Sequence, residues 1–398
     1  MKNFIFLSPN FPDSYWQFCS ELKKNGIRVL GIGDCPYFEL REELRDSLDE
    51  YFKVSTLENY DEVYRAVAFF IYKYGPIDFL ESNNEYWLER DAQLRTAFNI
   101  TTGPQASDME RIKHKSAMKA FYAKAGIPTA RYHLAYEREA ALAFAHEVGY
   151  PVVAKPDNGV GANNTYRITC DEDLHHFFDV KDDNVYIMEE FVNGEVHTYD
   201  GIVDASGEPI FESGNVTPNS LMDIVNNNGD SIYYIVKDMP ADLLDAGRRT
   251  IKAFDVKSRF FHLEFFVLKA DQPGLGKKGD IIGLEVNMRP AGGYTPDLYN
   301  FAYEIDVYKI WADMIAFNQS TIPMDRPHHF CAFCGRRDGK PFVMDHDAIM
   351  NKYGWNMKMY GRIPEALSGA MANQMYVANF DTMEEMQQYY ADLLACHE

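Results

Sequence analysis

Residues 279–297, GDIIGLEVNMRPAGGYTPD, contain the strand-like run that most constrains what this chain can fold into. Successive side chains of a strand point to opposite faces, so we expect Glu285, Asn287 and Arg289 to share one face. The residues between them, which we expect to point into the core, are Leu284, Val286 and Met288. Carboxylate and amide oxygens suit a hard cation such as Mg²⁺, and an arginine beside them can stabilise charge that develops during phosphoryl or acyl transfer. The alternative is an ordinary strand with a solvated polar edge.

A second strand-like run, FFHLEFFVLK, lies just upstream at residues 260–269. Two such runs joined by a short loop rich in glycine and lysine predict an antiparallel pair. Glu264 stands in an otherwise apolar stretch, and an unpaired buried carboxylate would cost several kcal/mol. It therefore needs a cation, which is either a metal shared with the downstream strand or the side chain of Arg248 or Arg249.

Residues 149–168, GYPVVAKPDNGVGANNTYRI, predict a strand ending at Lys155, a glycine-containing loop and a second short strand. Backbone amides of such a loop, at Gly159 and Gly161, can cradle phosphate oxygens, and the lysine can neutralise them. We expect the loop to order over the phosphates when nucleotide binds. The spacing differs from a P-loop, and an ordinary hairpin connection is the alternative.

A helix is predicted over residues 107–125, with a capping box from Ser107 to Glu110 and a stop at Gly126. Its basic residues are Lys113, His114, Lys115 and Lys119. Further along, residues 185–204 read as two strands joined through Asn193 and Gly194. Their acidic residues, for which exposed charge near a turn is the alternative, are Glu189, Glu190 and Glu195.

In this order the segments resemble the ATP-grasp enzymes, over roughly residues 107–320. The motifs that carry the resemblance are HKSAMKAFYAKAGIPTA, YPVVAKPDNGVGANN, IMEEFVNGE, FHLEFF and GLEVNMRPAGG. Several motifs in order are more specific than any one of them. The resemblance implies two α+β subdomains that clasp ATP, preceded by a Rossmann-like domain. It implies ATP and Mg²⁺ as cofactors, with Mn²⁺ as an alternative metal.

The resemblance also implies roles for individual residues. Lys115, Lys155 and the loop glycines Gly159 and Gly161 would bind the nucleotide phosphates. The residues implied around the adenine are Glu190 and Val192, through their backbones, and the carboxylate of Glu189. Glu195 would contact the ribose, although it stands one residue before the usual position, which Val196 occupies.

At the metal end, the resemblance implies Glu264, Glu285 and Asn287 as magnesium ligands and Arg289 as the catalytic residue that contacts the acyl phosphate. The continuation through residues 290–293, Pro-Ala-Gly-Gly, is similar to that of the carboxylate-amine ligases, including L-amino-acid ligases. Small-molecule carboxylates and amines are therefore the expected partners, and a homodimer is compatible with the family.

Composition limits the other partners. The net charge of −21 argues against nucleic acid or an anionic membrane as the main partner. Neither a signal peptide nor a membrane span is evident, which predicts a cytoplasmic protein. The six scattered cysteines favour reduced thiols, and Cys331 and Cys334 are expected to be buried thiols rather than a zinc site.

A chain of 398 residues is too long for one ordinary core, and its length predicts two or three domains. Alternating strands and helices over the first hundred residues predict a parallel α/β unit. The expected divisions are a Rossmann-like domain (1–105), a small ATP-grasp subdomain with its connecting helix (106–192), a large ATP-grasp subdomain with the metal and catalytic site (193–325), and a C-terminal subdomain (326–398). In the last, Arg336 and Arg337 either grip a substrate carboxylate or are solvated.

The first functional hypothesis is an ADP-forming ligase that activates a carboxylate as an acyl phosphate for attack by an amine. A second enzyme hypothesis keeps the ATP chemistry but activates bicarbonate, as carboxylases do. The third hypothesis is a nucleotide-binding protein without turnover, which would be free to lose Arg289 and the three ligands Glu264, Glu285 and Asn287.

Overall fold

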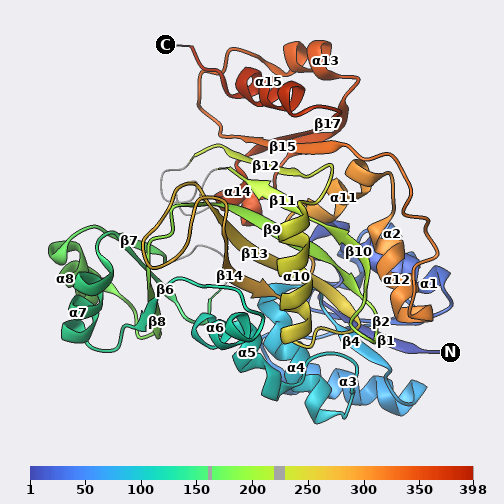
Figure 1. Ribbon diagram of the computed structural model, residues 1–398. Coiled ribbons are helices and arrows are strands. Elements are labelled where there is room, and N and C mark those ends of the chain that lie inside the picture. The colour runs from blue at the N-terminus through green and yellow to red at the C-terminus, as the bar shows by residue number, and fades with distance from the viewer. Residues whose placement is uncertain (160–163, 219–228, 398) are drawn as a thin grey trace.

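The computed structural model describes residues 1–159, 164–218 and 229–397 (Figure 1). The described residues form three β-sheets, each with helices packed on it. Gly161 of the expected phosphate loop lies outside these residues. No helix in the described ranges is long and apolar enough to cross a membrane.

The N-terminal unit is a parallel sheet of strand order β3-β2-β1-β4, which confirms the α/β unit predicted from the sequence. Its strands are β1 (Asn3–Leu7), β2 (Arg28–Gly33), β3 (Glu50–Lys53) and β4 (Phe79–Glu81). Its helices are α1 (Trp16–Lys24), α2 (Glu42–Ser47), α3 (Tyr60–Tyr74) and α4 (Leu88–Ala97). The 3₁₀ turn η3 (Glu85–Trp87) follows β4, at the carboxyl end of the sheet.

Two short helices lead out of this unit, where one continuous helix was expected. They are α5 (Met109–Lys113) and α6 (Lys115–Lys124), preceded by the 3₁₀ turn η4 (Ala106–Asp108). The capping box is formed by Gln105 and Asp108, so the predicted one at Ser107 is wrong. The helix breaks at His114 because Asp157 caps the N-terminus of α6. The Asp157 carboxylate accepts a hydrogen bond from the Ser116 amide at 2.7 Å.

The second sheet forms a lobe that stands apart on the left of Figure 1. Its strands run antiparallel in the order β5-β8-β6-β7. They are β5 (Tyr132–Leu134), β6 (Val152–Pro156), β7 (Tyr166–Ile168) and β8 (Tyr186–Glu190). The helices α7 (Arg138–Val148) and α8 (Asp171–Val180) cover its outer face (Figure 1). We call residues 132–190 the lobe.

Among the described residues the third sheet has nine strands, ordered β14-β13-β9-β11-β12-β15-β17-β16, with β10 paired to β9. The strands on the site side are β9 (Gly194–Val203), β10 (Pro209–Ser213), β11 (Asn215–Thr217), β12 (Ser231–Ile235), β13 (Arg259–Leu268) and β14 (Ile281–Asn287). The C-terminal strands are β15 (Phe330–Arg336), β16 (Met357–Arg362) and β17 (Gln374–Phe380). Residues on both sides of the boundary expected at 325–326 thus share one sheet, and the four-part division stays a prediction.

Helices cover this sheet on both faces and at its C-terminal end (Figure 1). They are α10 (Ala241–Ala253), α11 (Thr295–Tyr303), α12 (Val307–Phe317), α13 (His346–Tyr353), α14 (Glu365–Met371) and α15 (Met383–Leu394). Helix α10 packs closely: a Cβ added at Gly247 would lie 2.1 Å from the ring of Tyr199 on β9.

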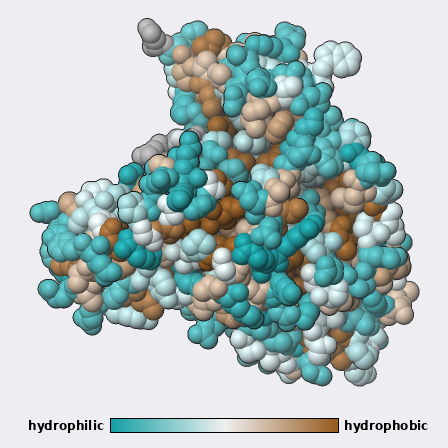
Figure 2. Space-filling model, viewed as in Figure 1, coloured by the Kyte–Doolittle hydropathy of each residue, from teal (hydrophilic) through white to brown (hydrophobic). Residues whose placement is uncertain are grey.

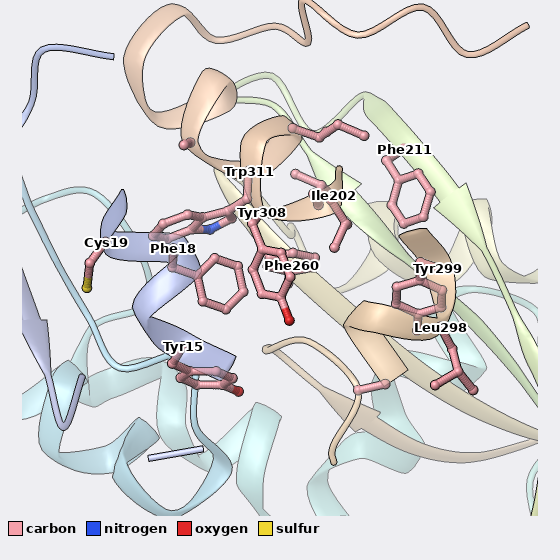
Figure 3. Packing of buried hydrophobic residues seen from close by; sticks show 14 of the residues in the cluster. Tyr15, Phe18, Cys19, Ile202, Phe211, Phe260, Leu298, Tyr299, Tyr308 and Trp311 are labelled. Carbon is pink, nitrogen blue, oxygen red and sulfur yellow. The ribbon is translucent and has the colours of Figure 1, made fainter. Parts of the chain in front are cut away.

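An aromatic cluster joins the N-terminal unit to the nine-stranded sheet (Figure 3). Trp311 of α12 lies edge-on to Phe18 of α1, with ring centroids 5.0 Å apart, and Phe18 meets Phe260 of β13 at 5.8 Å. Trp311 and Phe18 are buried. This packing brings the carboxyl end of the N-terminal sheet close to the end of β14, where the predicted site residues lie.

Candidate active site

The pairing of β13 with β14 brings the expected metal ligands together. The strands are antiparallel, as predicted, and Glu264 lies opposite Glu285 while His262 lies opposite Asn287. Directly opposed residues of an antiparallel pair point to the same face. Glu264, Glu285 and Asn287 therefore present two carboxylates and one amide oxygen on one face of the sheet.

A β-bulge sets this arrangement. The register shifts at Leu284, which is half-buried, so the expectation that it points into the core is wrong. The bulge places Gly283 on the opposite face from Glu285, against Tyr122 of α6. A Cβ at Gly283 would lie 2.5 Å from the Tyr122 ring, so a side chain there would push the strand away from the helix.

Lysines from two other elements reach this face or its neighbourhood. Lys115, at the start of α6, places its Nζ 3.1 Å from a carboxylate oxygen of Glu285 and 3.4 Å from the carbonyl oxygen of Gly159. Lys155, at the end of β6, places its Nζ 2.6 Å from Glu189 on β8. The structure thus brings the two expected phosphate lysines, the loop glycine and the face with the expected metal ligands into one region.

Lys119 of α6 forms a second ion pair with Glu189 and was not expected as a site residue. Burial opposes ionisation of Glu189, but the charges of Lys119 and Lys155 outweigh it and lower the pKa of Glu189 to about 2. Burial also lowers the pKa of Lys119, since Glu189 compensates it only in part. The carboxylate is therefore held ionised between two lysines.

The cationic partner of Glu264 is a histidine. His262 places Nε2 3.1 Å from a Glu264 oxygen and Nδ1 2.6 Å from Asp200 on β9. Burial disfavours the charged imidazole, but Asp200 and Glu264 outweigh burial and raise the pKa of His262 to about 9. The expected alternative of a salt bridge to Arg248 or Arg249 is wrong, because these arginines pair with Glu212 and Asp245.

Arg289 follows β14, and each of its three guanidinium nitrogens donates a hydrogen bond. Its Nε donates to Glu85 of η3 at 3.0 Å, one terminal nitrogen donates to the Pro290 carbonyl at 2.9 Å, and the other donates to Asn287 at 3.3 Å. Glu85 also pairs with Lys113 of α5. Sequence reasoning missed Glu85. The available signal was its position after β4, since functional residues gather at the carboxyl ends of parallel strands.

Glu195 lies apart from this group. It pairs with Val267 across the β9–β13 ladder, whereas Thr198 pairs with Glu264, so alternation places Glu195 on the opposite face. Its carboxylate accepts from His197 Nε2 at 3.0 Å. This placement argues against the expected ribose contact, and Val196 is the residue on the site face.

The region expected to hold adenine is apolar and includes a backbone amide, that of Val192, that is available to a ligand. The Glu190 carboxylate binds Arg131 through two guanidinium nitrogens, and its own amide donates to the Arg131 carbonyl. Within the described ranges the amide of Val192 has no protein acceptor. An apolar cluster surrounds it, comprising Ala130, Val192, Phe266, Leu268 and Ile282. Figure 2 shows apolar side chains gathered where the lobe meets the main body.

Comparison with known proteins adds the family context. No protein-family model matches the chain. The L-arginine-specific L-amino acid ligase of Bacillus subtilis is 26% identical over 259 residues, which make up 62% of this chain and 60% of that ligase. The chain thus aligns with about three fifths of that relative's length.

Solved structures match over almost the whole chain. An L-amino acid ligase from Bacillus licheniformis has a TM-score of 0.73 at 15% sequence identity, covering 98% of this chain and 96% of that one. The biotin carboxylase domain of a 2-oxoglutarate carboxylase from Hydrogenobacter thermophilus, solved with MgADP, ADP and bicarbonate, has a TM-score of 0.70 at 14% identity, covering 97% and 88%. The chain has the ATP-grasp fold.

The fold class expected for an ATP-grasp protein, a Rossmann-like domain followed by a two-part clasp, is thereby confirmed. The α6 lysines pair with Glu189 of the lobe and with Glu285 of the nine-stranded sheet, so the candidate site lies between these two parts.

The donor set of this candidate site suits magnesium. Across the described ranges no group of three or more His, Cys, Asp or Glu side chains forms a metal cluster. Glu264 and Glu285 with Asn287 supply three hard oxygen ligands, and Mg²⁺ commonly takes its remaining ligands from phosphates and water. The residues present therefore fit Mg²⁺, or the similar Mn²⁺, together with a nucleotide.

The C-terminal arginines bind backbone carbonyls. Arg337 donates to the carbonyls of Gly229, Ser368 and Gly369, and Arg336 donates to the Met344 carbonyl and stacks on Phe342. Both are buried, so the solvated alternative is wrong, and the substrate-gripping role stays a prediction.

The two cysteines of the C-x-x-C motif are also buried. Cys331 and Cys334 of β15 are buried in two different apolar clusters, which confirms the expected burial of both thiols.

Proposed function

We propose that this protein is an ATP-dependent ligase that joins a carboxylate to an amine and releases ADP and phosphate. The observation that carries the proposal is the convergence of Lys115 and Lys155 on the face that bears Glu264, Glu285 and Asn287, with Arg289 directly after it. The likeness to the L-arginine-specific ligase of Bacillus subtilis supports the same reaction class.

The nucleotide would lie between the lobe and the nine-stranded sheet. Lys115 and Lys155 neutralise its phosphates, and Glu189 keeps Lys119 as its partner when Lys155 turns toward them. The Val192 amide and the backbone of Glu190 face the adenine, whose rings suit the apolar cluster around Val192. Gly159 lies at the phosphate end of this region.

Glu264, Glu285 and Asn287 would hold Mg²⁺ or Mn²⁺, which neutralises phosphate charge and orients the transferred group. His262 keeps Glu264 oriented for this role through the hydrogen bond to its carboxylate. The donors are fixed by strand register rather than by a loop, which favours a preorganised site.

The chemical steps need charge compensation more than a protein nucleophile. An oxygen of the carboxylate substrate bonds to the γ-phosphorus while the bond from that phosphorus to ADP breaks. The amine nitrogen then bonds to the acyl carbon, loses a proton and expels phosphate. Arg289 is the side chain placed to meet the negative charge that grows on the acyl phosphate.

A bicarbonate-activating enzyme is the second candidate. The specific observation in its favour is the likeness to the biotin carboxylase domain solved with MgADP and bicarbonate. The ligase reading is preferred because the residues after Arg289, Pro290 to Gly293, resemble those of carboxylate-amine ligases. A homodimer and a cytoplasmic location remain predictions of the sequence.

The deciding experiment measures ATP consumption across a matrix of amino acids, dicarboxylates and amines, with bicarbonate as a separate arm. A ligase gives ADP, phosphate and an amide product only when both a carboxylate and an amine are present. ATP loss that requires bicarbonate alone favours the carboxylase-type reaction. Formation of AMP and pyrophosphate would exclude the acyl-phosphate route.

A further inference from the structure

The N-terminal unit contributes a carboxylate to the site, from a position 204 residues before its partner. Glu85, in the turn after β4, places Oε2 3.0 Å from the Nε of Arg289, and its other oxygen pairs with Lys113. The Glu85 side chain is only 11% exposed. An ion pair of this kind is strongly directional because neither partner can turn to water.

The hydrogen bonds of Arg289 determine which of its N–H groups remain for a ligand. Of its five N–H groups, one binds Glu85, one binds the Pro290 carbonyl and one binds Asn287. Among the described residues, the second N–H group of each terminal nitrogen has no acceptor. A guanidinium with N–H groups left on both terminal nitrogens can bind a carboxylate or phosphate through two hydrogen bonds.

Glu85 is poorly suited to act as a base. Burial favours its neutral form, but the charges of Arg289 and Lys113 outweigh burial and lower the pKa of Glu85. The carboxylate therefore stays ionised and is already occupied by two cations. Two cations against one anion leave the cluster with one surplus positive charge, which suits an anionic group.

We propose that Glu85 is a positioning residue that fixes the guanidinium of Arg289, so that the N-terminal unit completes the active site. Without Glu85, only the two terminal contacts would restrain the guanidinium, and its Nε edge would be free to rotate. That Arg289 then meets an acyl phosphate rests on the proposed function. The positional claim itself rests on the contacts alone.

The chain offers a matched control in Glu81, at the end of β4. Its carboxylate is also buried and also bridges two cations, Arg95 at 3.3 Å and Arg259 of β13 at 3.1 Å. It joins the same two parts of the molecule without touching Arg289. Loss of Glu81 tests docking of the N-terminal unit, whereas loss of Glu85 tests docking and positioning together.

The kinetic test compares Glu85→Gln, Glu85→Asp and Glu81→Gln with the wild type on the ligated substrates. In Glu85→Gln we expect kcat to fall by about 100-fold, the effect of a small misplacement of a catalytic group, with little change in KM for ATP. Glu85→Asp keeps the charge and should recover part of kcat. Glu81→Gln should keep wild-type kcat. Equal losses in Glu81→Gln and Glu85→Gln would overturn the positioning role.

A second measurement needs no substrate. The rate at which phenylglyoxal modifies Arg289, followed by peptide mass mapping, reports how firmly the guanidinium is held. We expect faster modification in Glu85→Gln than in the wild type or Glu81→Gln. Equal rates in the three proteins would overturn the proposal even if the ligase activity is real. Faster modification in a protein that ligates nothing would support the positional claim and refute the proposed function alone. If Glu85→Gln fails to fold, Glu85→Asp serves in both measurements.

Discussion

Two junctions join the N-terminal unit to the nine-stranded sheet, and they are built from opposite materials. One is the aromatic cluster of Phe18, Trp311 and their neighbours, which is buried and apolar (Figure 3). The other is ionic and consists of Glu81 with Arg259 and Glu85 with Arg289. Burial of apolar surface stabilises in proportion to area, whereas a buried ion pair loses most of its attraction to desolvation. The aromatic junction should therefore supply stability and the ionic junction orientation.

The largest effect tests the aromatic side of this comparison. Trp311→Ala should lower the free energy of unfolding by about 3–5 kcal/mol, because the buried ring fills space that its neighbours cannot close. The measurement is urea denaturation followed by circular dichroism. Trp355 is fully exposed, so Trp355→Ala is the matched control and should change stability by less than about 0.5 kcal/mol. Similar losses in the two variants would mean that the aromatic junction contributes little.

The second effect tests the polar face. Glu285→Gln should reduce turnover by about 10²–10³-fold with little change in stability, since a neutral amide leaves the metal and phosphate charges uncompensated. Asn287→Ala should act in the same direction. The readout is ligation at limiting magnesium. Glu195→Gln is the control because its side chain lies on the opposite face, and it should keep wild-type turnover. A defect in Glu195→Gln as large as that in Glu285→Gln would contradict the face assignment.

The sequence was sufficient to predict contacts that follow from the alternation of side chains along a strand or from segments close together in the chain. The pairing of β13 with β14, the shared face of Glu264, Glu285 and Asn287, and the parallel N-terminal sheet are of this kind. Glu85 was missed because its partner Arg289 is 204 residues away and meets it only through the packing of two folding units.

Contacts with residues distant in the sequence explain the remaining differences. The expected helix over residues 107–125 breaks because a distant carboxylate, Asp157, caps a new helix start. The inward placement of Leu284 fails because the strand bulges where Tyr122 packs on Gly283. Asp157 and Tyr122 both lie far along the chain from the segments whose structure they change, so the local sequence gives no sign of either contact. Lys119 was seen as a basic residue, but its pairing with Glu189 depends on how α6 meets the lobe.

The third effect concerns the dependence of stability on pH. Glu189 has an ordinary pKa of 4.5 that is lowered to about 2 in the folded protein. Its contribution is therefore fully present above pH 4.5 and is lost as the pH falls toward 2. We expect the wild type to exceed Glu189→Gln in unfolding free energy by on the order of 3 kcal/mol at pH 7, with a difference that shrinks below pH 4.5. Denaturant melts at several pH values measure it, and a constant difference would show that Glu189 is not held ionised by the lysines.

The smallest effect separates the role of Lys155 from that of Arg289. Lys155→Ala should raise the KM for ATP by about tenfold while kcat changes little, because a phosphate lysine acts on charge already present in the ground state. The fold should tolerate the change, since Glu189 keeps its ion pair with Lys119. Arg289→Ala should show the reverse pattern, a lower kcat with a nearly unchanged KM for ATP, because the charge it meets grows only during the reaction. Steady-state kinetics with both variants under the same conditions measure the contrast. If both variants change kcat and the KM for ATP in the same proportion, Lys155 does not act mainly on ATP binding and Arg289 does not act mainly on the reaction step.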